Sequence, residues 1–319
     1  MSNLACHSDE RWFKAVSTGL SHRGFSLGDS DQGILNLILV QTPLFGKFLV
    51  SLPYINSAGV SNASDKSAHQ LVSDACELAD RLDVKYLELR HESPVHHPSL
   101  NYQRTDKFHM RLELPSTDEL LDRTFKSKLR SQVRKADQAG HEVLFGGHEL
   151  LDSFYDIFAV NMRDLGTPVF SKKLFKSILE EFSSDAEICV VVNKARPVAA
   201  ALLVHSRNKT EVPSASCLRT WNHTGANMWM YRHLLRRAIE RGSNTFDFGR
   251  SSMDSGTYRF KKQWGAAPYP ATWQYYVRQG SVEDMRPESA TNQRLIRVWK
   301  KLPVWGTRLI GPSIVRGIP

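Results

Sequence analysis

Two stretches of this chain repeat the same order of elements, and this repetition constrains the fold more than any other feature of the sequence. In the first stretch, an amphipathic helical pattern over 67–82 leads to the apolar run VKYLEL and then to Arg90. In the second, a helical pattern over 227–241 leads to the run TFDFG and then to Arg250. Each run contains an acid and has the length of a strand. Alternating helices and strands predict an α/β (α+β) chain, and the repeated order predicts two related halves that meet near residue 120.

The other periodic segments complete both halves. Short apolar or alternating runs predict further strands at 34–40, 47–52, 108–114, 187–193, 198–206, 211–220 and 270–277. Amphipathic patterns predict further helices at 148–165 and 171–182, and a basic helix that includes 123–135 and is closed by Gly140. We therefore expect a first domain over 1–120, a second over 121–280 and a basic tail over 281–319.

The charge of the chain favours anionic partners. Its 319 residues include 42 Lys and Arg against 33 Asp and Glu, which gives a net charge of +9. Nucleic acid, phosphorylated substrates and an anionic membrane surface all fit this excess, and so does a role in solubility alone.

The cysteines and the N-terminal residues indicate a reducing, cytoplasmic location. The cysteines are far apart and form no CxxC pair, which argues against a zinc site or a disulfide framework; they are Cys6, Cys76, Cys189 and Cys217. The first residues lack the apolar core of a signal peptide. The most apolar segment, 33–55, is interrupted by Pro43 and Gly46, so it predicts two strands rather than a membrane span.

Familiar catalytic motifs are missing from the sequence. It contains no GxxxxGK[ST], no GxGxxG after a strand, no HExxH and no GxSxG. This argues against P-loop NTPases, Rossmann dehydrogenases, zincins and α/β-hydrolases. His91, His96 and His97 lie in the proline-containing segment RHESPVHHP, and we interpret them as a surface cluster rather than metal ligands. We expect no metal.

The segment TFDFGRSSMDSGTYRFKKQWG, residues 245–265, concentrates charged and aromatic residues around one bend. Arg250 follows the predicted strand, and a small-residue loop leads to a short helix that Ser255 or Thr257 can cap. Lys261 lies about one turn into that helix, whose free N–H groups favour an anion. Arg250 and Lys261 could converge on a phosphate or a developing oxyanion. For this segment alone, a solvated helix with both cations in water is the simpler interpretation.

Five blocks of sequence, spread from about residue 40 to the end, occur together. They are LFGKFLVSLPYINSAGV (44–60), LELR (87–90), NMRDLGTPVF (161–170), FDFGRSSMDSGTYRFKKQWG (246–265) and the ending WKKLPVWGTRLIGPSIVRGIP. Together they resemble the FemAB family, in the branch associated with PEP-CTERM/exosortase exopolysaccharide systems. The resemblance implies two GNAT-like domains, each a mixed, mostly antiparallel sheet flanked by helices.

The resemblance also implies a peptidyltransferase-type enzyme. FemAB-like proteins move an aminoacyl group from aminoacyl-tRNA to an amine in cell-envelope synthesis, so we expect acyl or aminoacyl transfer in envelope or exopolysaccharide synthesis. The donor would be an aminoacyl-tRNA or an acyl-CoA, and no resident cofactor is expected.

The resemblance assigns Lys261 as the motif lysine that steadies charge on the reacting ester. Amide formation also needs further positive charge and a proton acceptor, for which Arg250 and Asp247 are the candidates, with Asp254 as an alternative acceptor. The expected substrate-binding residues are Arg90, Asn161, Arg163, Thr167, Tyr258, Phe260 and Trp264. Asp247 could instead simply pair with Arg250.

Two departures from the family pattern keep other functions open. The chain before residue 34 is short, which predicts a reduced first domain, and the turn RTWNHTGANM lacks the loop that holds CoA in GNAT acetyltransferases. One alternative is nevertheless a CoA-dependent N-acyltransferase that acts on a sugar or lipid-linked intermediate. Another is a non-catalytic nucleic-acid-binding module built on the basic segment 123–135, which lacks interleaved stacking aromatics.

The C-terminal residues 289–319 contain six basic residues and no acid, interleaved with Trp299, Trp305 and aliphatic residues. Such a tail can pack on its own domain, which is the simpler interpretation. It can also lie on anionic lipid at the inner membrane surface.

Overall fold

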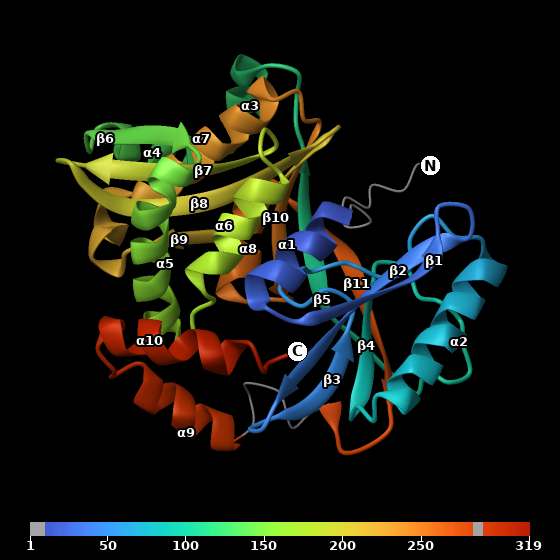
Figure 1. Cartoon of the computed structure of the whole chain (residues 1–319). Helices are drawn as coiled ribbons and strands as arrows, with labels where there is room; N and C mark the ends of the chain where they lie inside the picture. Colours follow the sequence, from blue (N-terminus) through green and yellow to red (C-terminus); the bar gives the residue numbers. More distant parts are fainter. Residues whose placement is uncertain (1–9, 283–289) are drawn as a thin grey trace. The chain divides into compact units, whose positions relative to one another are not determined.

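The computed structural model describes residues 10–282 and 290–319, the latter without the side chains of 290–292. The chain forms two compact units that interleave along the sequence (Figure 1). The first unit comprises Met1–Lys107, Gly166–Glu181 and Pro270–Pro319. The second comprises Phe108–Leu165 and Phe182–Tyr269. These units are not the three consecutive segments expected from the sequence, whose domain boundaries stay a prediction.

The strands of the first unit follow the order β1-β2-β3-β4-β11. Their bounds are β1 (Arg23–Asp29), β2 (Gly33–Thr42), β3 (Gly46–Val50), β4 (Tyr86–His91) and β11 (Ala267–Val277), of which Pro270 onward lies in this unit. β3 pairs with β4 in parallel, and the other three pairings are antiparallel. The predicted pair of strands around the Pro43 turn is confirmed as β2 and β3.

The helices of the first unit are α1 (Glu10–Leu20), α2 (Asp65–Arg81), α6 (Lys172–Glu181), α9 (Ala290–Trp299) and α10 (Val304–Val315). The Ser64 hydroxyl caps α2 by accepting a hydrogen bond from the Ser67 N–H at 3.2 Å. The apolar face of α2, including Leu71 and Val72, shares a buried core with Leu35 and Leu87 of the strands. The sheet and α2 thus share one buried core of this unit.

The strands of the second unit follow the order β5-β10-β9-β8-β7-β6. Their bounds are β5 (Tyr102–Glu113, from Phe108 in this unit), β6 (His141–Gly146), β7 (Ala186–Asn193), β8 (Arg196–Ser206), β9 (Lys209–Cys217) and β10 (Thr245–Ser252). β6, β7, β8 and β9 pair antiparallel in sequence, and β10 pairs with β9 in parallel.

Helices cover both faces of this second sheet. They are α3 (Asp118–Thr124), α4 (Ser127–Asp137), α5 (Leu151–Leu165), α7 (Ala226–Glu240) and α8 (Gly256–Gln263), with short 3-10 helices η2 (His148–Leu150) and η3 (Arg219–Thr224). Met230 and Leu234 of α7 share a core with Ala199 and Ala201 of β8. The intervening residue Ala200 is also fully buried, and α5 packs on β8 as well. Since alternate strand residues face opposite sides, α5 and α7 cover opposite faces.

The structure confirms the fold class and most of the predicted elements, but it corrects three details. The sequence patterns did not predict α1, β1 or β6. The expected basic helix over 123–135 is two helices, α3 and α4, because the backbone is extended at Phe125 and Lys126. Phe125 turns into the core, where its ring lies edge-on to Trp264 at 5.4 Å. The strand that was expected to end at Gly249 continues to Ser252.

Two further observations concern location. Among the described residues, no helix combines the length and the apolar character needed to cross a membrane. Cys76, Cys189 and Cys217 are free thiols, the first two buried and the third partly buried, while Cys6 lies outside the described residues.

Candidate functional site

The candidate site is built where β10 turns toward α8. Gly249 has a φ of +77°, a conformation that a residue with a Cβ rarely adopts. Its N–H donates to Oδ1 of Asp247 at 2.8 Å, which closes a tight local turn within β10. The Ser255 hydroxyl then accepts from the Tyr258 N–H at 3.1 Å and caps α8, as the sequence predicts. This sequence of contacts fixes the start of the helix that carries Lys261.

Lys261 is a buried cation that rests on backbone carbonyls. Its side chain is mostly enclosed, and the residue is 8% exposed. Its Nζ donates to the carbonyl oxygens of Gly249 at 3.1 Å and Arg250 at 2.9 Å. Because an ammonium has three hydrogens, this leaves one for another acceptor. The simpler alternative, a solvated helix with Lys261 in water, is therefore wrong.

The surroundings of Lys261 shift its pKa. Burial lowers the pKa to about 8; the Asp247 carboxylate raises it, and the Arg250 guanidinium lowers it further. The amine therefore gains or loses its proton close to neutral pH, unlike an ordinary lysine. Titratable groups perturbed by burial next to specific charges are a mark of functional sites.

Asp247 is held by a residue that the sequence analysis missed. Its Oδ2 accepts from Nε of Arg111 on β5 at 3.0 Å, and both side chains are buried. The guanidinium of Arg111 also lies 5.5 Å from the ring centroid of Tyr269. The structure thus pairs Asp247 with Arg111. No local signal marked Arg111, which lies 136 positions before Asp247 in an alternating strand.

The aromatic residues of α8 anchor the helix to the core. Trp264 and Tyr258 are buried in the core of the second unit. Phe260 is partly buried, and its ring lies 4.9 Å from that of Tyr231. These contacts hold Lys261 in place through its own helix. That Phe260 and Trp264 also line a substrate pocket stays a prediction.

The other predicted substrate-binding residues lie in different surroundings. On α5, Asn161 donates through Nδ2 to the Ser216 hydroxyl at 3.0 Å, and Nε of Arg163 lies 2.6 Å from Asp164 Oδ1. Thr167 is exposed in the first unit, and Asp254 is exposed in the loop before α8 with a φ of +58°. Of the predicted site residues, Asp247, Arg250 and Lys261 are therefore the ones that lie close together in the second unit.

Arg90 occupies a structural position within the first unit. Its Nε donates to Glu88 at 2.7 Å and its Nη1 to the Ile55 carbonyl at 2.6 Å. The guanidinium stacks 4.2 Å from the Trp273 ring centroid. Through these contacts, Arg90 ties β4 to the loop after β3. A direct role in substrate binding stays a prediction.

The histidine cluster is also different from expectation. His91 is buried in β4, with Nδ1 3.0 Å from Oε1 of Gln274, and burial lowers its pKa to about 4. The interpretation of His91 as a surface residue is therefore wrong. His97 contacts the Ser73 hydroxyl at 2.9 Å. Within the described parts of the chain, no group of His, Cys, Asp and Glu has the arrangement of a metal site.

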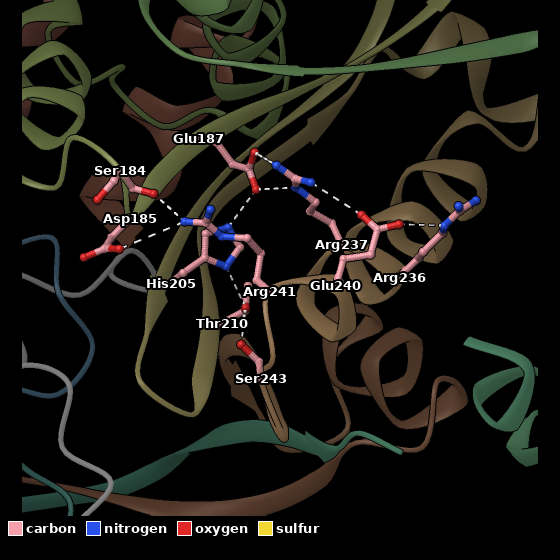
Figure 2. Close-up of polar contacts among 10 residues, drawn as sticks. All are labelled: Ser184, Asp185, Glu187, His205, Thr210, Arg236, Arg237, Glu240, Arg241 and Ser243. Carbon is pink, nitrogen blue, oxygen red and sulfur yellow. Dashed lines mark hydrogen bonds and ion pairs between the residues drawn. The ribbon is translucent and has the colours of Figure 1, made fainter. Parts of the chain in front are cut away.

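A second, partly buried polar cluster lies in the same unit, shown in Figure 2. Glu187 of β7 accepts from Nε of Arg237 at 2.7 Å and from Nη2 at 2.9 Å. Its Oε1 also lies 2.8 Å from Nε2 of His205 on β8. Nδ1 of His205 lies 2.8 Å from the Thr210 hydroxyl, which lies 2.8 Å from that of Ser243. We call these five residues the Glu187 cluster.

The Glu187 cluster joins elements rather than forming an open site. Burial alone would raise the pKa of Glu187, but hydrogen bonds and charge from His205 and Arg237 outweigh it and lower the pKa to about 2. The chain of contacts connects β7, β8, β9, α7 and the turn before β10. In the sequence, Glu187 and His205 are only an acid and a histidine in two neighbouring predicted strands. That they meet depends on the register in which the strands pair, which local patterns do not show.

The segment before α7 bears on the identity of the acyl-group donor. The turn RTWNHTGANM forms the six-residue 3-10 helix η3 and the start of α7, and Gly225 between them has a φ of +77°. A Cβ at Gly225 would lie 2.8 Å from Cβ of Ala136 on α4. His141 Nε2 lies 3.3 Å from the Thr224 carbonyl. Residues of α4 and β6 therefore pack closely against the start of α7.

The comparisons with known proteins indicate a fold of the GNAT type. Residues 123–262, which include β10 and Lys261, match the family described as an acetyltransferase (GNAT) domain. No curated protein sequence matches the chain.

Solved structures show the same fold at low sequence identity. The structure of FemX is 16% identical, with a TM-score of 0.61, and the match covers 91% of this chain and 93% of FemX. A conserved protein of unknown function from Bacteroides thetaiotaomicron is 8% identical, with a TM-score of 0.58 and coverages of 85% and 92%. L-PGS from Bacillus licheniformis is 14% identical, with a TM-score of 0.56 and coverages of 97% and 99%. These similarities confirm the predicted GNAT-like fold.

Proposed function

We propose that this protein is a FemAB-like acyltransferase that moves an aminoacyl or acyl group to an amine acceptor in cell-envelope or exopolysaccharide synthesis. The observation that carries the proposal is Lys261, a buried cation held at the β10–α8 turn of a GNAT-type fold. Lys261 has no salt bridge at hydrogen-bonding distance within the described part of the chain, and burying a cation in this way costs free energy. Such a cost is characteristic of functional sites. The similarity to FemX supports the aminoacyl form of the reaction.

The reaction needs charge stabilisation more than a strong nucleophile. The acceptor amine attacks the carbonyl carbon of the donor ester, a C–N bond forms, and negative charge develops on the carbonyl oxygen. The third hydrogen of the Lys261 ammonium is the donor to this oxygen, and Arg250 adds positive charge nearby. The C–O bond then breaks, and the leaving oxygen takes the proton that the amine loses.

Asp247 is the candidate relay for that proton. Its two oxygens accept hydrogen bonds from the Gly249 N–H and from Arg111, and both contacts hold the side chain in place. The same contacts fix the Asp247 charge that favours the protonated form of Lys261. No metal or resident cofactor is required by this chemistry.

The donor is proposed to be an aminoacyl-tRNA. The close packing of Gly225 against Ala136 at the start of α7 disfavours the loop geometry with which GNAT enzymes bind CoA. The acetyltransferase match over 123–262 is the observation that favours the second candidate, a CoA-dependent N-acyltransferase.

A donor screen tests the proposal. Purified protein is incubated with aminoacyl-tRNAs or acyl-CoAs and a panel of amine acceptors, and amide products are measured by mass spectrometry. We expect product with aminoacyl-tRNA in the wild type and loss of product in Lys261→Ala. The control variant Lys262→Ala, which removes the exposed side chain of the next residue, should behave as the wild type does. Product from acyl-CoA alone would favour the second candidate. Salt-sensitive RNA binding without any transfer would instead favour a nucleic-acid-binding module.

A further inference from the structure

The last two helices expose a concentrated set of apolar side chains in the first unit; they are coloured red in Figure 1. We call this set the tail patch; its members are Leu295, Val298, Trp305, Leu309 and Ile310. Trp305 is 73% exposed and Leu309 is 72% exposed, which is unusual for side chains of this size. Grouped exposed apolar residues on a soluble protein mark a site of interaction.

The opposite side of α10 is anchored to the protein. Thr307, Gly311 and Val315 are buried and recur every four residues, so they form one face of the helix. At Gly311 a Cβ would lie 3.0 Å from the backbone N of Val169, so the glycine permits close packing. Leu309 lies two positions from Thr307, about 200° around the helix, and therefore points away from this face.

The helix α9 is arranged in the same way. Trp299 is buried, and a Cβ on Gly166 would lie 2.5 Å from Ile296, which shows how closely this side of α9 packs. Leu295 and Val298 are exposed, at 63% and 61%. The tail patch is thus held outward by two docked helices. The expectation that the tail packs on its own domain accounts for one face of each helix and leaves the other without a described partner.

The exposed charged side chains of α9 and of the turn that follows it are all positive. Arg294, Arg297, Lys300 and Lys301 are exposed along α9 and the turn that follows it. The segment 289–319 contains no Asp or Glu to neutralise them. Basic side chains that flank an exposed tryptophan and aliphatic residues are typical of helices that lie in the interface of an anionic membrane.

We propose that α9 and α10 bind the surface of an anionic phospholipid membrane, with the tail patch inserted at the interface and the four basic residues among the lipid phosphates. Neither helix spans the membrane, since each has too few residues. A second copy of this chain is a poorer occupant because it would bring the same positive charges into contact. The inference does not depend on the transfer reaction.

Vesicle sedimentation tests this inference. The full chain is mixed with vesicles of phosphatidylglycerol and phosphatidylcholine, or of phosphatidylcholine alone, and the pelleted fraction is measured. We expect binding to the anionic vesicles that weakens as salt is raised. The variant Trp305→Ser/Leu309→Ser should reduce the partition coefficient at least about tenfold, because two inserted side chains are lost. The control Leu144→Ser, at an exposed leucine of β6, should bind as the wild type does.

A charge reversal tests the electrostatic part separately. Arg297→Glu/Lys301→Glu should lose binding to anionic vesicles, whereas the control Lys66→Glu, exposed on α2, should retain it. All substituted side chains point to solvent, so thermal melts should show that the variants stay folded. The inference is overturned if the wild type does not sediment with anionic vesicles, or if the tail-patch variant sediments equally well. It is also overturned if light scattering shows a dimer that Trp305→Ser dissociates.

Discussion

The two buried polar clusters of the second unit hold their charges in opposite ways. Glu187 is enclosed by Arg237 and His205, and these partners lower its pKa to about 2, so that the charged form is favoured. Lys261 rests on the neutral carbonyls of Gly249 and Arg250, and burial lowers its pKa to about 8, so that the charged form is disfavoured. The first arrangement stabilises the fold. The second leaves a partly desolvated cation in the folded protein. This costs free energy and serves a purpose only if the cation interacts with a substrate.

The largest expected effect on stability comes from the ion pair beside Lys261. Arg111→Met leaves the Asp247 carboxylate buried without its partner, and we expect the free energy of unfolding to fall by about 3–5 kcal/mol. Urea denaturation measures it. The control is Lys107→Met, which removes a contact to the exposed Asp106 and should cost less than about 1 kcal/mol. Equal losses in both variants would mean that the Arg111–Asp247 pair does not behave as a buried ion pair.

A smaller loss is expected from the Glu187 cluster. Glu187→Gln removes the charge that Arg237 and His205 share, and we expect the free energy of unfolding to fall by about 2 kcal/mol. The control is Glu240→Gln, which alters contacts to Arg236 and Arg237 at a largely exposed site. If Glu240→Gln lowers the free energy of unfolding as much as Glu187→Gln does, the burial of Glu187 does not make its contacts more stabilising than exposed ones.

The same variant tests the direction of the Glu187 shift with pH. The folded pKa of about 2 lies below the unfolded value of about 4.3, so the stabilisation is complete above the unfolded pKa and is lost as pH falls through the folded pKa. The difference in melting temperature between the wild type and Glu187→Gln should therefore shrink as pH is lowered from about 5 towards 2. A difference that stays constant over this range would contradict the comparison.

The smallest stability change is expected at Lys261. Lys261→Met removes the desolvation cost of the cation together with two hydrogen bonds, and these changes should cancel to within about 1 kcal/mol at neutral pH. The folded pKa of about 8 lies below the ordinary 10.5, so the unfolded state binds the proton more tightly. The wild type should gain stability relative to the variant as pH rises from 8 to 10.5. A large loss of stability in Lys261→Met at pH 7 would show that Lys261 stabilises the fold, as Arg237 and His205 do through Glu187.

The sequence predicted most of the fold because the fold follows from local periodicity. The strand–turn–strand at β2 and β3, the amphipathic α2 and the helix–strand order around α7 and β10 all carry their signal within a few residues. The break between α3 and α4 was missed because it depends on Phe125 entering a distant core. Local pattern cannot show which side chain a core will accept.

The candidate site was predicted only in part, for the same reason. Asp247, Arg250 and Lys261 lie within one segment, so their grouping followed from the sequence. Arg111 was invisible because only the order of β5 and β10 in the sheet brings it to Asp247. The burial of Lys261 was also unexpected, since a helix with adjacent lysines looks solvated.

The most direct test of the central claim is the pH dependence of amide formation by wild type and Lys261→Met. Taking the ratio of their kcat/KM values cancels the titration of the acceptor amine. We expect a ratio of about 100 at pH 7, because one donor to the developing oxyanion is lost. The ratio should fall as pH rises through about 8, where Lys261 loses its proton. A ratio near one at pH 7, or one that does not change across pH 8, would contradict the role of Lys261 as the catalytic cation.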